Sequence, residues 1–172
     1  MRKGYIQVYT GNGKGKTTAS LGVALRAAGA GHHVFIGQFT KGLHCSEHKA
    51  LERFNDLITI KQYGEPGFIN SKPSERNIEL AEHALAELYE IVLAGKHELV
   101  ILEEANIATH YNLIKVEALL ELIRKKPEHV ELIFTGRHAD PRLIEVADLV
   151  TEMKEIKHYK NQGVPARIGI EK

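Results

Sequence analysis

A glycine-rich segment near the start of the chain, GNGKGKTT at residues 11–18, constrains the fold more than any other part of the sequence. The usual phosphate-binding loop, G-x-x-x-x-G-K-[ST], would place its first glycine at position 10. That position holds Thr10 instead, and the glycine comes one residue later, at Gly11. The replacement of this glycine by threonine matters only if the residue at position 10 needs a positive φ. Gly11 and Gly13 can form the turn instead. A glycine-rich surface turn without a ligand is the alternative interpretation.

The residues on either side of this segment favour a phosphate loop. An apolar strand is expected before it, at residues 5–10, and a helix of small residues after it, at residues 17–31. In this arrangement the backbone N–H groups of the loop and the positive end of the helix converge on an anion. Lys16 would contact the outer phosphates, Lys14 would add a second cation inside the loop, and the Thr17 hydroxyl can bind Mg²⁺.

Short apolar runs alternate with longer helical patterns along the chain. Strands are expected at residues 5–10, 33–39, 57–63, 98–106, 130–137 and 149–158, and helices at residues 17–31, 46–54, 74–94, 112–126 and 140–148. This alternation is typical of a parallel sheet, and the continuous apolar runs LVIL and LIF are typical of strands buried on both faces. We predict an α/β, three-layer, P-loop NTPase-like (RecA-like) fold with a mainly parallel central sheet and helices on both faces. Residues 1–172 are expected to form a single P-loop nucleotide-binding domain.

Single residues predict where several helices begin and end. Ser46 is expected to cap the second helix, and Asp140 to cap the last one, with Pro141 at its first position. Gly95 is expected to end the third helix, and Pro127 to end the fourth.

Two carboxylates follow the apolar run LVIL, and they are expected to lie beside the phosphate loop. Ligands of parallel sheets bind beyond the carboxyl ends of the strands, where residues 135–137 should also lie. A Mg²⁺-nucleotide site usually takes a carboxylate from a neighbouring strand. If the strand stays extended, Glu103 and Glu104 face opposite ways, and Glu104 shares a side with Asn106. A solvated pair at a strand end is the alternative. Arg137 could bind phosphate or form a structural ion pair.

Composition argues against several other classes of protein. The formal net charge is only +1, and the aromatic content is 6% without tryptophan, so nothing indicates a nucleic-acid partner. The opening residues MRKGYIQVYTG do not read as a signal peptide, and no stretch approaches the ~18 apolar residues of a membrane span. Together with the single cysteine, these features predict a cytoplasmic protein without a membrane partner.

Cysteine and histidine give only weak signals. Cys45 is the only cysteine, so neither a disulfide nor a cysteine-based zinc cluster can form within the chain. A nucleophilic role beside His44 is possible, but a partly buried thiol is the simpler interpretation. The ten histidines, among them His44, His48 and His110, match no metal-ligand spacing and are expected to be scattered over the surface.

Four segments together resemble the P-loop type of corrinoid adenosyltransferase, the cob(I)yrinic acid a,c-diamide adenosyltransferase family. They are residues 9–42, VILEEAN at residues 100–106, TGRHADPRLIEVADLVTEM at residues 135–153, and IKHYKNQGVPARIGIEK at residues 156–172. The resemblance covers nearly the whole chain, and a threonine before GNGKGKTT is typical of the family.

The resemblance implies transfer of the 5′-deoxyadenosyl group of ATP to cobalt(I) of a corrinoid, with release of triphosphate, in adenosylcobalamin biosynthesis or salvage. In such enzymes ATP lies on the loop in the reverse sense compared with ordinary P-loop ATPases. The implied partners are ATP, a corrinoid, Mg²⁺ (or Mn²⁺), a second copy of the chain in a homodimer, and an electron donor such as a flavoprotein.

The same resemblance implies roles for individual residues. Lys16 and Glu104 would be catalytic, Thr17 and Glu104 would bind the metal, with Glu103 a possible further ligand, and Phe68 would contact the corrinoid. ATP would be bound by Gly11, Asn12, Gly13, Lys14, Gly15, Lys16, Thr17, Thr18 and Arg137.

The chain departs from the family pattern at two positions. Glu103 stands where an aspartate is usual, and Asn70 stands where some members carry tryptophan. Two other functions stay open at this point. One is a P-loop ATPase or small-molecule kinase, which would produce ADP, and the other is a non-catalytic paralogue that binds the nucleotide or the corrinoid.

Overall fold

The computed structural model of the protein describes residues 3–65 and 73–172. Six strands form one sheet in the order β3-β2-β4-β5-β1-β6, and every neighbouring pair is parallel. The strands are β1 (Ile6–Thr10), β2 (Val34–Gln38), β3 (Ile58–Gln62), β4 (Leu99–Glu103), β5 (Glu131–Thr135) and β6 (Leu149–Glu152). The prediction of a mainly parallel sheet is confirmed.

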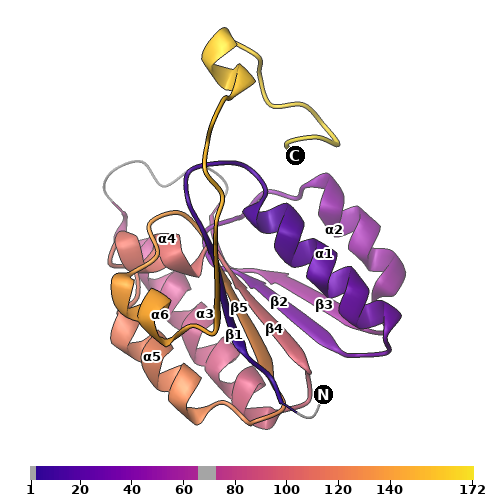
Figure 1. The fold of residues 1–172 in the computed structure, drawn as a ribbon, viewed down its shortest axis with the longest axis vertical. Coiled ribbons are helices and arrows are strands. Elements are labelled where there is room, and N and C mark those ends of the chain that lie inside the picture. The colour runs from indigo at the N-terminus through magenta and orange to yellow at the C-terminus, as the bar shows by residue number, and fades with distance from the viewer. Residues whose placement is uncertain (1–2, 66–72) are drawn as a thin grey trace.

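Helices cover both faces of this sheet (Figure 1). On one face lie α1 (Lys16–Gly29) and α2 (Ser46–Leu51), which continues into the 3₁₀ turn η1 (Glu52–Phe54). The opposite face carries α3 (Glu75–Ala94), α4 (Ala105–His110), α5 (Val116–Lys125) and α6 (Pro141–Val146). A second 3₁₀ turn, η2 (Tyr159–Gln162), lies in the segment after β6. The three layers confirm the predicted P-loop NTPase-like architecture.

The central strand β4 explains why its sequence is a continuous apolar run. Leu99 and Ile101 pack into the core beneath α1 and α2, whereas Val100 and Leu102 pack into the core beneath α3 and α5. All four side chains are essentially inaccessible to solvent. Side chains alternate across a strand, so a strand covered on both faces must be apolar at every position.

Most of the helix ends follow the predicted residues. Asp140 caps α6 through a 2.9 Å bond from the amide of Arg142, and Pro141 is the first helical residue. Gly95 ends α3 in the left-handed conformation, with φ 62°. The predicted serine cap of α2 is wrong, because Cys45 occupies the N-cap position and Ser46 is the first residue of the helix.

Three further boundaries differ from those predicted. The last strand, expected over residues 149–158, ends at Glu152. The strand expected to reach residue 106 ends at Glu103, and α4, which the sequence did not predict, begins at Ala105. The helix expected from residue 112 begins at Val116, since Asn112 has φ 56° and Leu113 and Ile114 insert into the core. Short helices with few periodic residues are the elements that hydrophobic patterns identify least well.

Candidate nucleotide-binding site

The segments predicted to carry the chemistry do meet at one edge of the sheet. The glycine-rich loop follows β1, Glu104 follows β4, and Gly136 and Arg137 follow β5. The strands β4, β5 and β1 are neighbours in the sheet and run parallel, so their carboxyl ends lie side by side. Figure 1 shows the loop between β1 and α1 at this edge.

The displaced first glycine of the loop has a simple structural explanation. Thr10 is the last residue of β1, in extended backbone, and its hydroxyl accepts a 3.3 Å bond from the amide of Ala139. The left-handed conformations fall on Gly11, with φ 94°, and on Gly15, with φ 119°. Gly13 is needed for another reason: a Cβ there would lie 2.7 Å from the carbonyl oxygen of Met153. The loop therefore turns without a glycine at position 10.

Lys16 lies at the centre of this loop. It is the first residue of α1, only 9% of its surface is exposed, and its ammonium group donates 2.7 Å bonds to the carbonyls of Gly11 and Gly13. Burial lowers its pKa, which the nearby charge of Glu104 partly offsets. The first amides of α1 have no partner within the helix, so cation and amides together can bind an anion.

The remaining side chains of the loop differ in solvent exposure and in their contacts. Thr17 is half-buried at the start of α1, while Asn12 and Thr18 are exposed. Lys14, predicted as a second cation inside the loop, has its ammonium group turned toward the segment after β6. There it contacts Glu171 at 2.8 Å and the hydroxyl of Tyr159 at 3.1 Å.

Glu104 does not continue the strand, so the premise of the predicted alternation with Glu103 is wrong. Its φ of 59° turns the chain into α4, and its amide donates a 3.0 Å bond to the hydroxyl of Thr135. Burial and the charge of Glu103 raise the pKa of Glu104, while Lys41, Lys16 and Arg137 oppose the rise. The Glu104 carboxylate thus lies within the field of the phosphate-loop lysine.

Glu104 and Asn106 both lie close to Gly136. One carboxylate oxygen lies 3.2 Å from where a Cβ on Gly136 would be, so glycine leaves room for it. The side-chain amide of Asn106 donates to the carbonyl of Gly136 at 3.0 Å. Its own oxygen is buried without a protein partner among the described residues. Hydroxyl, carboxylate and amide oxygens are the ligands that Mg²⁺ prefers, so Thr17, Glu104 and Asn106 fit this ion chemically.

Glu103 is fully buried and belongs to a different network. Its carboxylate accepts hydrogen bonds from the side-chain amide of Gln38 and, at 3.1 Å, from the ammonium group of Lys41. The Gln38 oxygen in turn lies 2.8 Å from Nε2 of His48. Gln38 and Glu103 are paired across β2 and β4. Sequence reasoning missed the network of Gln38, Lys41 and His48. The one signal in the sequence was Gln38, a polar residue at the end of the apolar strand VFIG.

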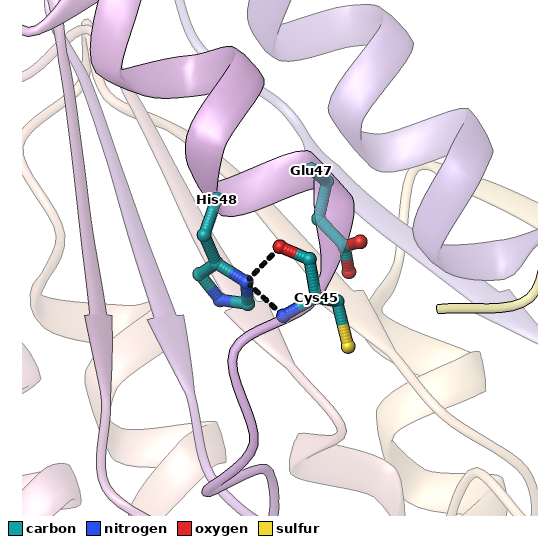
Figure 2. Close-up of side chains that lie close together, drawn as sticks. All are labelled: Cys45, Glu47 and His48. Atoms are coloured by element: carbon teal, nitrogen blue, oxygen red, sulfur yellow. Dashed lines mark hydrogen bonds between the residues drawn. The ribbon is translucent and has the colours of Figure 1, made fainter. Parts of the chain in front are cut away.

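His48 also bears on a possible metal site, drawn in Figure 2. Ligand atoms of Cys45, Glu47 and His48 lie within 4.8 Å of one another. However, Nδ1 of His48 accepts a 2.9 Å bond from the amide of Cys45, and Nε2 then carries the proton that Gln38 accepts. With both ring nitrogens engaged, His48 is a structural residue. The prediction of surface histidines is wrong for His48, which is 4% exposed, whereas Cys45 is the expected partly buried thiol.

The other predicted residues are placed as follows. Arg137 is exposed at the end of β5 and forms no ion pair with the part of the chain that the structure describes, so nothing supports the structural ion-pair interpretation. Beside it, His138 stacks on His110 with ring centroids 4.2 Å apart. Phe68 and Asn70 lie outside the described residues.

Fold and site together define a P-loop NTPase-like protein of the α/β class. The strand–loop–helix unit with Lys16 at its centre and a carboxylate beyond the end of β4 is the arrangement that Mg²⁺-nucleotide sites require. Over residues 3–65 and 73–172, no helix combines the length and apolar character needed to cross a membrane.

The chain belongs to the ATP:corrinoid adenosyltransferase family. A family profile described as ATP:corrinoid adenosyltransferase BtuR/CobO/CobP matches residues 2–171. A corrinoid adenosyltransferase of Sinorhizobium is 37% identical over 172 residues, covering 98% of this chain and 80% of the relative. Those of Pseudomonas aeruginosa and Escherichia coli K12 are 34% and 33% identical, covering 98% of this chain and 84% and 86% of the relatives.

Proposed function

We propose that this chain transfers the 5′-deoxyadenosyl group of ATP to cobalt(I) of a corrinoid and releases triphosphate. The observation that carries the proposal is the position of Lys16, which is buried in the glycine-rich loop and lies within the field of the Glu104 charge. The family profile matches the chain over residues 2–171. We also propose that residues 1–172 act as one P-loop nucleotide-binding domain.

The reaction requires little acid–base catalysis by the protein. The electron pair of cobalt(I) forms the new cobalt–carbon bond at the ribose 5′-carbon, and the carbon–oxygen bond to the triphosphate breaks with its electron pair. No proton has to leave the nucleophile, so no general base is needed. What the protein must supply is in-line placement of the reactants and stabilisation of the negative charge that grows on the leaving group.

The residues of the loop are suited to that second task. Lys16 is held by two carbonyl oxygens at 2.7 Å in a position where its charge is poorly solvated, which strengthens its interaction with an anion. We assign ATP binding to the loop residues Gly11, Asn12, Gly13, Lys14, Gly15, Lys16, Thr17 and Thr18, and to Arg137. Phe68 is assigned to the corrinoid by resemblance alone.

Mg²⁺ fits the oxygen atoms near the loop, and Thr17 and Glu104 would hold it. A bound Mg²⁺ would neutralise charge on the triphosphate oxygens. Glu104 contributes a partly buried carboxylate, and Asn106 contributes an acceptor that lacks a protein partner among the described residues. Glu103 is less suited to this role, because Gln38 and Lys41 already engage both of its oxygens.

Three wider features complete the proposal. A homodimer is supported by β6, which lies at an edge of the sheet and leaves Leu149 and Val150 more than 40% exposed. An electron donor such as a flavoprotein is expected, because the corrinoid must be reduced to cobalt(I). We place the protein in the cytoplasm, in keeping with its single cysteine, Cys45.

The product of the reaction tests the proposal. Chemically reduced corrinoid, ATP and Mg²⁺ should give the absorption change of an adenosyl-corrinoid together with one equivalent of triphosphate, separated by ion-exchange chromatography. Lys16→Ala should reduce this rate about 100-fold, whereas Lys160→Ala, an exposed lysine of η2, should leave it unchanged. Release of ADP instead of triphosphate would identify a P-loop ATPase or kinase and contradict the proposal.

A further inference from the structure

Residues 135–139, at the end of β5 and directly after it, join two parts of the candidate site. β5 lies between β4, which leads to Glu104, and β1, which leads to the phosphate loop (Figure 1). Thr135 is the last residue of β5 and is only 1% exposed. This segment therefore lies where it can contact both the residues after β4 and the start of the loop.

Two hydrogen bonds hold the residues after β4 on this segment. The hydroxyl of Thr135 accepts a 3.0 Å bond from the amide of Glu104. The carbonyl of Gly136, the next residue, accepts a 3.0 Å bond from the side-chain amide of Asn106. The backbone of Glu104 and the side chain of Asn106 are thus fixed by two consecutive residues at the end of one strand.

Two further hydrogen bonds connect the same segment to the start of the phosphate loop. The amide of Gly136 donates to the carbonyl of Tyr9 at 3.1 Å, and the amide of Ala139 donates to the hydroxyl of Thr10 at 3.3 Å. Thr10 immediately precedes Gly11, the first glycine of the loop. Residues 135–139 therefore set the position of Glu104 relative to the phosphate loop.

The conformation of Glu104 requires a partner of this kind. Its φ of 59° lies in the left-handed region, which is unfavourable for a residue with a side chain and persists only where surrounding contacts hold it. Gly136 meets a second requirement, since a Cβ at that position would lie 3.2 Å from a carboxylate oxygen of Glu104. Thr135 thus holds the backbone of Glu104, while Gly136 leaves room for its side chain.

A structural role alone would explain a buried threonine, but not the choice of its partner. Thr135 bonds the residue whose carboxylate lies within the field of Lys16. Asn106, held by the following residue, is fully buried, and its side-chain oxygen has no protein partner among the described residues. An orphaned acceptor next to a carboxylate indicates that this turn is shaped for a ligand.

We propose that Thr135 is a positioning residue for the metal-binding carboxylate, because its hydroxyl holds the backbone turn that keeps Glu104 available to Mg²⁺ at the phosphate loop. The inference rests on the proposed function, which takes Glu104 as a ligand of Mg²⁺. It gives a role to the first two residues of the sequence TGR, beside the ATP-binding role proposed for Arg137.

The affinity for Mn²⁺, a paramagnetic substitute for Mg²⁺, tests this role in the presence of ATP by electron paramagnetic resonance on the full chain. Thr135→Val removes the hydrogen-bond acceptor and keeps a β-branched side chain that suits a strand. It should weaken Mn²⁺ binding about tenfold, as expected when a group that orients a metal ligand is lost. Thr135→Ser keeps the hydroxyl and should bind Mn²⁺ nearly as tightly as the wild type. Thr59→Val, at an exposed threonine of β3, is the matched control and should change nothing.

The affinity for ATP without a metal, measured by calorimetry, separates positioning from a general disturbance of the loop. This affinity should be unchanged in Thr135→Val, and urea unfolding shows whether the variant is folded. If it does not fold, Thr135→Cys repeats the comparison, because it differs from the serine variant only in its much weaker acceptor.

Three results would overturn the role of Thr135 while leaving the proposed function intact. They are normal Mn²⁺ affinity in the variants without the hydroxyl, an equal loss in Thr135→Ser, and an equal loss of ATP affinity with and without the metal. A wild type that bound Mn²⁺ and ATP but formed no adenosyl-corrinoid would overturn the proposed function alone. A wild type that bound no Mn²⁺ in the presence of ATP would overturn both.

Discussion

Glu103 and Glu104 are adjacent in the sequence, yet their side chains belong to two different regions of the molecule. Glu103 is the last residue of β4, and its fully buried carboxylate is hydrogen-bonded by Gln38 and Lys41. Glu104 takes a positive φ, follows β4 at the carboxyl ends of the strands, and lies in the field of Lys41, Lys16 and Arg137. One change of backbone conformation therefore separates a supporting network from the candidate nucleotide site.

The comparison teaches that burial alone does not identify a functional carboxylate. Glu103 is fully buried and Glu104 is partly buried, but Glu103 is matched by hydrogen-bond donors from its own chain. The rise in the pKa of Glu104, caused by burial and by Glu103, indicates that its charge is incompletely compensated within the chain. Such a group is suited to a cationic ligand, whereas a matched one contributes to structure.

The largest predicted effect separates the two carboxylates by activity. Glu104→Gln should reduce the turnover number about 100-fold or more, because it removes the charge proposed to bind Mg²⁺. The melting temperature of this variant should not fall, since a partly buried and poorly compensated charge is lost. Steady-state kinetics and thermal unfolding measure the two quantities. The exposed Glu145→Gln serves as control, and full activity in Glu104→Gln would remove this residue from the site.

The converse effect is expected at Glu103. Glu103→Gln should lower the free energy of unfolding by about 3 kcal/mol, because Lys41 loses its buried partner, while activity at a temperature where the variant is folded stays within a few-fold of the wild type. Urea unfolding gives the stability. Glu47→Gln, which removes the more distant carboxylate 3.7 Å from Lys41, should cost less than about 1 kcal/mol. Equal losses in the two variants would contradict the network.

A smaller loss of stability is predicted for variants of His48, which is connected to Glu103 through Gln38. His48→Ala leaves the Gln38 oxygen and the Cys45 amide without their partner, and should cost about 2 kcal/mol of unfolding free energy. His48→Asn should recover part of that loss, because an amide oxygen can accept from Cys45 in place of Nδ1. If both variants matched the wild type in urea unfolding, the histidine would have no supporting role.

The smallest effect concerns an ion pair at the surface, which contrasts with the pair that the half-buried Lys41 forms with the buried Glu103. Lys61 and Glu87 lie 2.6 Å apart with side chains 45% and 31% exposed, so Glu87→Gln should cost less than about 1 kcal/mol at neutral pH. The hydrogen bond from Lys61 lowers the pKa of Glu87 below its ordinary 4.5. Its stabilisation is therefore present above that ordinary value and lost as the pH falls through the lowered one. Unfolding of wild type and variant should converge in acid; a gap that widened there would refute this assignment.

Several parts of the fold could be predicted because local chemistry decides them. The glycine-rich loop between an apolar strand and a small-residue helix located the site, and Asp140 and Gly95 marked helix ends through their own backbone preferences. The run LVIL indicated burial on both faces of the sheet.

The rest depends on contacts between distant segments. Gln38 and Glu103 meet because β2 and β4 are paired, and Lys14 and Glu171 meet because the segment after β6 returns to the loop. The turn at Glu104 depends on Thr135, a neighbour only in the folded sheet. Periodicity within one segment carries no information about such partners.

Metal binding by the variants Glu103→Gln and Glu104→Gln tests most directly whether Glu104 binds the metal and Glu103 has a structural role. Mn²⁺, as a paramagnetic substitute for Mg²⁺, can be titrated in the presence of ATP and followed by electron paramagnetic resonance. The account predicts that Glu104→Gln weakens Mn²⁺ binding at least about tenfold, the loss of one charged ligand, whereas Glu103→Gln changes it by less than twofold. Loss of binding in Glu103→Gln with normal binding in Glu104→Gln would contradict it.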